Sequence, residues 1–116
     1  MPATPFRADV GGSRDLATIE LHGDIDGSAE AGLGTAYADA AALDAIALYL
    51  DFAGVAYINS TGIALIVRLV ADAGRDGRAV RAAGLSPHYL EIFRITRLSD
   101  YLQILDAPAS GPAGDG

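Results

Sequence analysis

The sequence predicts a single α/β domain with a small mixed β-sheet. The first observation is that residues 6–10 and 17–22 alternate apolar and polar side chains, with the period of two that is typical of half-buried strands. The second is that two later strand-like segments, residues 45–50 and 78–83, alternate with helical patterns. The third is that 116 residues with 51% hydrophobic content suffice for one compact core but not for two.

The N-terminal part is expected to be a β-hairpin followed by a helix. Residues 11–15 separate the two alternating segments and have the Gly, Ser and Asp composition of a turn. Residues 23–27 are rich in Gly and Asp and are expected to close the second strand. A helix should then run from about residue 28 to residue 43. Its buried face is predicted to be formed by five residues: Leu33, Ala36, Tyr37, Ala40 and Ala41.

The middle of the chain predicts a central strand and an apolar helix. Residues 45–50 are continuously apolar, which indicates a strand that is covered on both faces. It should lie parallel to residues 78–83, with a right-handed connection between the two. The helix is predicted to begin at about Ser60 and to run to about Ala73, with Gly74 as its left-handed end.

The C-terminal part predicts one more helix, a short strand and a tail. Ser86 can cap this helix, and Pro87 suits its first position because the missing N–H costs nothing there. Four of its side chains are expected to face inward: Tyr89, Leu90, Ile92 and Phe93. A turn and a short strand are expected over residues 100–105. Residues 1–106 are therefore predicted to form the domain, and residues 107–116, mostly Pro, Gly, Ala and Ser, a flexible tail.

Three polar residues, Asn59, Ser60 and Thr61, stand at the predicted start of the apolar helix. Each has a side-chain oxygen that can accept a hydrogen bond from the first free N–H groups of the helix. The same N–H groups and the helix dipole also favour an anion, so a phosphorylated serine would be well placed there. Two interpretations follow: Ser60 or Thr61 is only a helix cap, or Ser60 is a site of phosphorylation.

The segment Tyr-Ile-Asn-Ser-Thr-Gly-Ile at residues 57–63 resembles the signature of the STAS domain, specifically that of bacterial anti-sigma-factor antagonists. The resemblance continues in Gly-Asp-Ile-Asp at residues 23–26 and in Leu-Ser-Pro at residues 85–87, followed by residues 92–98. It covers about residues 6–106. The family fold that it implies is a small mixed sheet with an N-terminal hairpin and with helices packed mainly on one side.

The resemblance also implies a partner and a modification. In this family the segment usually reads Asp-Ser-Ser-Gly or Asp-Ser-Thr-Gly, and its first serine is phosphorylated by a partner anti-sigma factor that is a serine kinase. Ser60 matches that serine, and Thr61 and Gly62 match the next two positions. Asn59 stands where the family usually has aspartate. A phosphoserine phosphatase is a further candidate partner.

The predicted partner surface lies around Ser60. The resemblance implies that the loop with Asp24 and Asp26 lies beside this serine, although two such carboxylates also suit turn formation and capping. Leu65 and Leu69 form a stripe of the apolar helix that is either exposed for docking or buried. A second stripe is expected to belong to the core: Ile63, Ile66, Val67 and Val70. The full predicted set is Asp24, Asp26, Asn59, Ser60, Thr61, Gly62, Leu65 and Leu69.

Composition argues against several other classes of function. A net charge of −7 disfavours nucleic acid or an anionic membrane as a partner, and it also favours a monomer. With no cysteine and two histidines, the chain has no recognisable zinc set, and no cofactor is expected. No apolar run reaches about 20 residues, and residues 1–5 do not begin a signal peptide. A cytoplasmic protein is therefore expected.

The function predicted from the sequence is that of a non-enzymatic anti-sigma-factor antagonist that phosphorylation at Ser60 switches off. The alternative is a STAS-type scaffold or a subunit of a transport complex, with Ser60 only a cap. A serine hydrolase is a third possibility in principle. The nucleophile motif of such enzymes begins with glycine, however, and Ile58 stands at that position.

Overall fold

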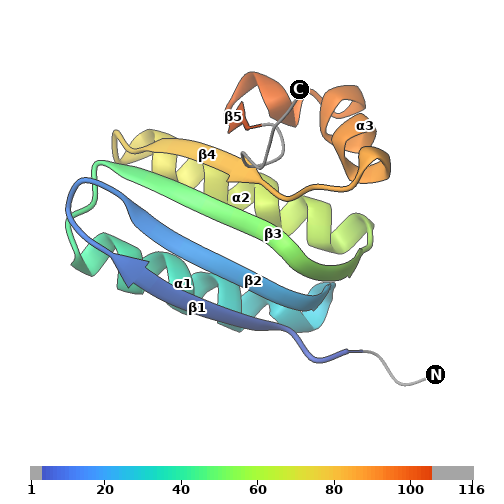
Figure 1. Cartoon of the computed structure of the whole chain (residues 1–116), viewed down its shortest axis with the longest axis horizontal. Helices are drawn as coiled ribbons and strands as arrows, with labels where there is room; N and C mark the ends of the chain where they lie inside the picture. The colour runs from blue at the N-terminus through green and yellow to red at the C-terminus, as the bar shows by residue number, and fades with distance from the viewer. Residues whose placement is uncertain (1–3, 106–116) are drawn as a thin grey trace, which may run out of the picture.

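The computed structural model describes residues 4–105, which form one five-stranded sheet with its helices (Figure 1). In chain order the elements are β1 (Arg7–Gly12), β2 (Ala17–Ile25), the 3-10 turn η1 (Gly27–Ala29), α1 (Glu30–Ala42), β3 (Ala47–Ile58), α2 (Ser60–Arg75), β4 (Ala79–Ala83), α3 (Pro87–Ile95), the 3-10 turn η2 (Leu98–Asp100) and β5 (Gln103–Ile104). The strand order is β1-β2-β3-β4-β5, with β1 antiparallel and the others parallel. The predicted α/β fold with a mixed sheet is confirmed.

The N-terminal hairpin forms as its alternating pattern predicts. β1 and β2 pair antiparallel, and every second residue of β2, from Ala17 through Leu21 to Ile25, lies in the core. β2 is three residues longer than predicted, because its pairing with β3 continues to Ile25 opposite Ile58. The prediction missed this extension because Gly23 and Asp24 are typical of turns.

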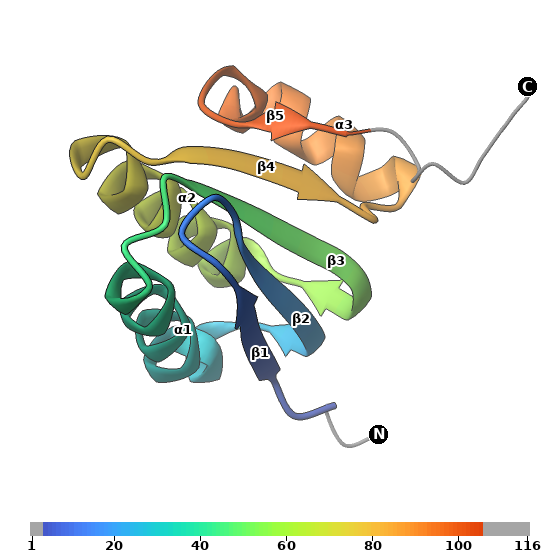
Figure 2. The same ribbon diagram turned by 60° about the vertical axis from the view of Figure 1, so that its left-hand side comes forward.

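The sheet separates two groups of helices. α1 and α2 lie side by side on one face (Figures 1 and 2), while α3 packs apart from them. The apolar side chains of β2 and β3 that face α1 and α2 include Ile19, Leu48 and Leu50, each at most 1% exposed. α3 is held by Phe93, whose ring meets that of Phe52 edge to face with centroids 5.7 Å apart. The core is thus continuous from the hairpin to α3.

α1 is close to its prediction, but the turn η1 precedes it directly, so the α-helix begins at Glu30. Of the five residues expected to be buried, Leu33, Ala36 and Ala40 are buried and the other two are half-buried. One of the half-buried residues, Tyr37, donates its hydroxyl hydrogen to a carboxylate oxygen of Asp76 at 2.5 Å. Burial, together with this carboxylate, raises the pKa of Tyr37 to about 12. The contact ties α1 to the C-terminal end of α2.

β3 is twice as long as the predicted central strand. Its first residues, from Ala47 to Leu50, are largely buried as expected, but the second half is mostly exposed. β3 has one more residue than β2 between the pairs Glu20–Asp51 and His22–Gly54, which makes a β-bulge. The bulged half carries the chain to the start of α2.

α2 ends later than predicted, and the stripe of its surface that faces the core differs from the predicted one. Gly74 lies inside the helix, and the left-handed residue is Gly77, whose N–H bonds to the carbonyl of Gly74 as in a Schellman motif. The prediction that Val67 belongs to the core is wrong, because 45% of it is exposed. Four side chains of α2 form the buried face instead: Ile66, Leu69, Val70 and Ala73.

The C-terminal elements match their predictions. Ser86 caps α3 by accepting a hydrogen bond from the N–H of Tyr89, and Pro87 occupies the first position. β5 pairs parallel with β4. The predicted tail, residues 107–116, falls outside the described part of the chain. Within residues 4–105, no helix is both long enough and apolar enough to cross a membrane.

Candidate functional site

The N-terminus of α2 is capped by Asn59. This residue has an extended backbone, with φ −94° and ψ −177°, and its side-chain oxygen accepts a hydrogen bond from the N–H of Gly62 at 2.8 Å. The interpretation of Ser60 or Thr61 as the cap is therefore wrong. The sequence could not decide among three adjacent polar residues, since each is a good cap. Asn59 is the cap because it directly follows β3 and keeps the extended backbone conformation that a cap requires.

Ser60 and Thr61 are the first two residues of α2, and both are exposed. The N–H groups at these positions have no partner within the helix, and they add to the positive end of the helix dipole. A phosphoryl group attached to the Ser60 oxygen would therefore meet a favourable local field. Because Asn59 provides the cap, the Ser60 hydroxyl is not needed to begin the helix.

This assignment of the cap predicts different effects for two neighbouring alanine substitutions. Asn59→Ala should lower the free energy of unfolding by about 1 kcal/mol, because the N–H of Gly62 loses its acceptor. Ser60→Ala should change it by less than about 0.5 kcal/mol. Urea unfolding of both variants measures this, with Asn59→Asp as the control that keeps a capping oxygen. Equal losses at positions 59 and 60 would contradict the assignment.

The loop after β2 lies against the start of α2. The N–H of Asn59 donates to the carbonyl oxygen of Ile25 at 3.2 Å. A Cβ atom at Gly62 would lie only 1.9 Å from this same oxygen, and one at Gly27 would lie 3.6 Å from the Thr61 methyl group. The expectation that this loop lies next to Ser60 thus agrees with the geometry. The backbones of the two segments are in close contact here.

Asp24 and Asp26 have different surroundings in this loop. Asp26 accepts hydrogen bonds from the hydroxyl and the N–H of Ser28, and these bonds lower the pKa of its carboxyl group. It caps η1, so the capping role considered for it is confirmed. Asp24 lies in β2 opposite Tyr57 and accepts a hydrogen bond from the N–H of Thr4 at 3.1 Å. Asp26 therefore belongs to the turn that contacts α2, whereas the carboxylate of Asp24 is bound to the N-terminal segment.

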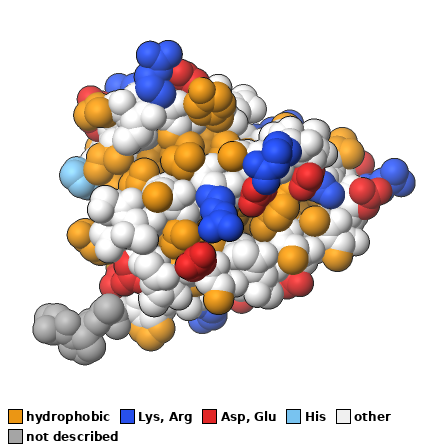
Figure 3. Space-filling view, turned by 180° about the vertical axis from the view of Figure 1, so that it is seen from behind, with side chains coloured by type: hydrophobic (Ala, Val, Ile, Leu, Met, Phe, Trp, Pro, Cys, Tyr) orange, Lys and Arg blue, Asp and Glu red, His pale blue; other side chains and the backbone are white. Residues whose placement is uncertain are grey.

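A groove of about 260 Å³ runs between α1 and α2. Tyr37 of α1 and Leu65 of α2, both half-buried, line it, and Leu69 lies at its floor with only 5% of its surface exposed. Arg68 and Glu30 reach across it as an exposed ion pair at 3.5 Å. Figure 3 shows this helical side of the molecule, on which hydrophobic patches alternate with charged groups. Of the two predicted docking leucines, only Leu65 offers appreciable surface.

The two histidines lie elsewhere. His22 projects from β2 toward Asp9 and Glu20, and His88 of α3 stacks edge to face on Tyr89. Among the described residues, neither histidine forms a hydrogen bond with Ser60. Sequence reasoning missed the cluster of Asp9, Glu20 and His22. The register of the hairpin could have revealed it, because that register pairs Asp9 with Glu20.

Comparison with known families gives one match. A family model described as "Mlab, STAS domain" matches residues 9–106. No curated protein matches the chain.

Solved structures similar to this one share its fold at low sequence identity. An anti-sigma factor antagonist from Mycobacterium paratuberculosis superposes with a TM-score of 0.73 at 17% identity, over 90% of this chain and 86% of the other. The anti-sigma factor antagonist SpoIIAA in its unphosphorylated form gives 0.65 at 17% identity, over 90% and 91%. A protein named TM1081, whose structure was determined by NMR, gives 0.73 at 12% identity, over 86% and 81%. At such identities the likeness concerns the fold.

Proposed function

Because the chain belongs to the STAS domain family, we propose that it is an anti-sigma-factor antagonist whose binding is ended by phosphorylation of Ser60. The partner would be an anti-sigma factor that is also a serine kinase. The observation that carries the proposal is the exposed hydroxyl of Ser60 at the first position of α2, which the fold does not use because Asn59 is the cap. Several structural neighbours are themselves anti-sigma factor antagonists, and one is a phosphorylated form of SpoIIAA from Bacillus.

The proposed switch is electrostatic. A phosphate adds a charge of about −1.5 to −2 at neutral pH. In the free protein the N-terminus of α2 accommodates this charge. In the complex the charge would have to be desolvated beside the carboxylates of Asp24 and Asp26, which opposes binding. The partner can thus be released without any refolding of the domain.

The proposed binding surface surrounds the start of α2 and continues along this helix. It comprises Asp24, Asp26, Asn59, Ser60, Thr61, Gly62 and Leu65, with Leu69 only at the floor of the groove. The net charge of −7 favours a partner with a basic face and disfavours self-association. The proposed protein is accordingly a monomer. The proposal also includes that it is non-enzymatic and cytoplasmic, and that a phosphoserine phosphatase restores its active form.

Phosphorylation of purified protein by its anti-sigma kinase and ATP tests the proposal. The kinase gene is expected close to the gene for this chain. Mass spectrometry should place one phosphate on Ser60, and Ser60→Ala should abolish it while partner binding persists. Thr61→Ala is the matched control, because it removes the neighbouring exposed hydroxyl and should leave the modification intact. A phosphate on Thr61, or on any other residue, would refute the assignment.

A second candidate is a STAS-type scaffold, or a subunit of a transport complex, in which Ser60 is never modified. One observation favours it: Asn59 replaces the usual aspartate of the family and completes the cap, so that the site is structurally complete without a phosphate. Under this alternative, the partner would bind irrespective of ATP. A pull-down with and without ATP separates the two candidates.

A further inference from the structure

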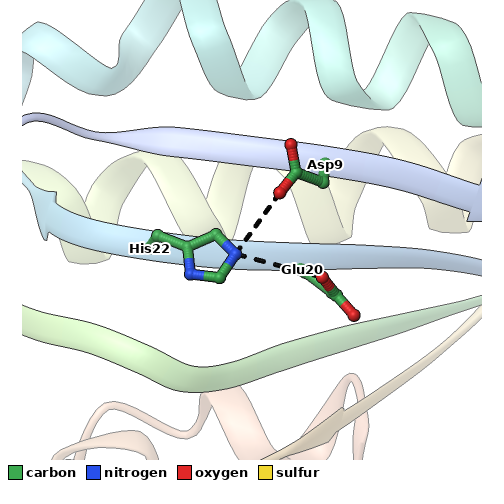
Figure 4. Close-up of side chains that lie close together, drawn as sticks. All are labelled: Asp9, Glu20 and His22. Carbon is green, nitrogen blue, oxygen red and sulfur yellow. Dashed lines mark ion pairs between the residues drawn. The ribbon is translucent and has the colours of Figure 1, made fainter.

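A second cluster of polar side chains lies on the N-terminal hairpin (Figure 4). Asp9 of β1 and Glu20 of β2 are directly paired across the strands, and His22 is two residues further along β2 on the same face. Nε2 of His22 lies 3.5 Å from a carboxylate oxygen of Asp9 and 4.0 Å from one of Glu20. One ligand atom from each residue falls within 4.8 Å of the others. The cluster faces away from α1 and α2 (Figure 4), since the alternate residues of β2 fill the core beneath those helices.

Nε2 of His22 has no hydrogen-bond partner, although the atom is screened from solvent. An atom of this kind normally has a partner, because an unsatisfied polar atom away from water is costly. The two nearby carboxylate oxygens lie within ion-pair distance of Nε2 but form no hydrogen bond with it. The imidazole nitrogen and the two anionic oxygens therefore border one small space. A cation at the centre of that space satisfies all three.

Gly54 of β3 leaves room for the imidazole ring in this position. His22 pairs with Gly54 just after the bulge, and a Cβ atom at Gly54 would lie 2.5 Å from Nδ1 of the ring. Any other residue there would push the ring away. The absence of a side chain on the neighbouring strand therefore permits the ring position in which Nε2 meets Asp9 and Glu20.

We propose that Asp9, Glu20 and His22 form a binding site for a divalent transition-metal ion such as Zn²⁺. One imidazole nitrogen and two carboxylates are ligands that this class of ion accepts, whereas Mg²⁺ and Ca²⁺ prefer oxygen alone. Ligands of a tetrahedral ion at about 2.1 Å are separated by about 3.4 Å, close to the 3.5 Å between His22 and Asp9. Glu20 is exposed and lies farther out, with a carboxylate oxygen 4.0 Å from Nε2 of His22, so its flexible side chain has to move inward before all three residues can bind one ion.

One cation already competes for this space. The Arg7 guanidinium lies 3.4 Å from the same Asp9 oxygen, but its side chain is 66% exposed. An exposed pair of this kind contributes little, so a metal ion can displace it at small cost. Three protein ligands leave at least one coordination position open to water or to a group from a partner. The site is independent of the proposed switch, since it uses no residue near Ser60.

Titration of the chelator-treated full-length protein with ZnCl₂ by calorimetry tests the proposal. The expected result is one Zn²⁺ per chain, with MgCl₂ giving no heat at the same concentrations. His22→Gln, Asp9→Asn and Glu20→Gln should each weaken binding at least about tenfold. Gly54→Ala should do the same although it removes no ligand, because it displaces the ring. Circular dichroism on each variant checks that the fold persists.

His88→Gln is the matched control, because it removes the other histidine and should leave the affinity unchanged. Cobalt substitution gives a second readout, since visible absorption bands depend on the nitrogen ligand and should be lost in His22→Gln. Three results would overturn the proposal: no Zn²⁺ binding up to millimolar concentration, equal weakening by His88→Gln, or binding by folded His22→Gln at the original affinity.

Discussion

Gly62→Ala is expected to lower the free energy of unfolding by about 3 kcal/mol or more. The new Cβ atom would lie 1.9 Å from the carbonyl oxygen of Ile25 and 3.0 Å from a methyl group of Ile58. The obstacle at Ile25 is backbone, which cannot turn aside as a side chain can, so α2 must move away from β2. That movement also strains the hydrogen bonds of Asn59 to Ile25 and of Gly62 to Asn59.

Gly74→Ala is the matched control for this prediction. It places the same methyl group in the same helix, but no atom lies within 4 Å of the new Cβ. It should stabilise the protein by about 0.5–1 kcal/mol, because alanine favours the helix. Urea or thermal unfolding of both variants gives the comparison. If Gly62→Ala proved as stable as the parent, the close contact of α2 with Ile25 would not be the feature that positions this helix.

Ser60→Glu is expected to weaken binding of the anti-sigma partner at least tenfold while the domain remains folded. A carboxylate in the first turn of a helix interacts favourably with the dipole, by about 0.3–1 kcal/mol. The isolated protein should therefore melt at close to the parent temperature. In the proposed interface the charge must be desolvated near Asp24 and Asp26, and about 1.4 kcal/mol of such cost already gives a tenfold loss.

A charge added far from the interface provides the control. Gln103→Glu makes the same change in net charge on β5, at an exposed position, and should leave the affinity unchanged. Calorimetric titration and thermal melts on the two variants measure both effects. Unchanged affinity of Ser60→Glu for a confirmed partner would place Ser60 outside the interface and favour the scaffold alternative.

Local sequence signals were sufficient where one residue type suits one position. The hairpin follows from its alternating side chains, and the start of α3 follows from Ser86 and Pro87, which have the cap and first-turn roles expected of them. The position of the start of α2 was predicted to within one residue, although the cap itself was not, because three adjacent polar residues suit it. That the start of α2 lies beside the loop with Asp24 was inferred from the family resemblance and not from the residues themselves.

Features set by contacts distant in the sequence were mispredicted. α2 is apolar nearly all round, so its periodicity did not define which stripe is buried, and Val67 was wrongly placed in the core. The close contact of Gly62 with Ile25 sets the rotation of the helix and brings Leu69 inward. Likewise, the extension of β3 depends on its pairing with β2, which no local pattern of residues 51–58 reveals.

The order of the strands also bears on how the chain emerges from the ribosome. Each strand pairs with the strand before it, so the sheet can grow at one edge in the direction of synthesis. β3 is complete before any of the 16 residues of α2 has been made. At about 5–20 residues per second, the synthesis of α2 takes about one to three seconds. Until α2 has been added, Leu48 and Leu50 lack one of the helices that cover them in the folded domain.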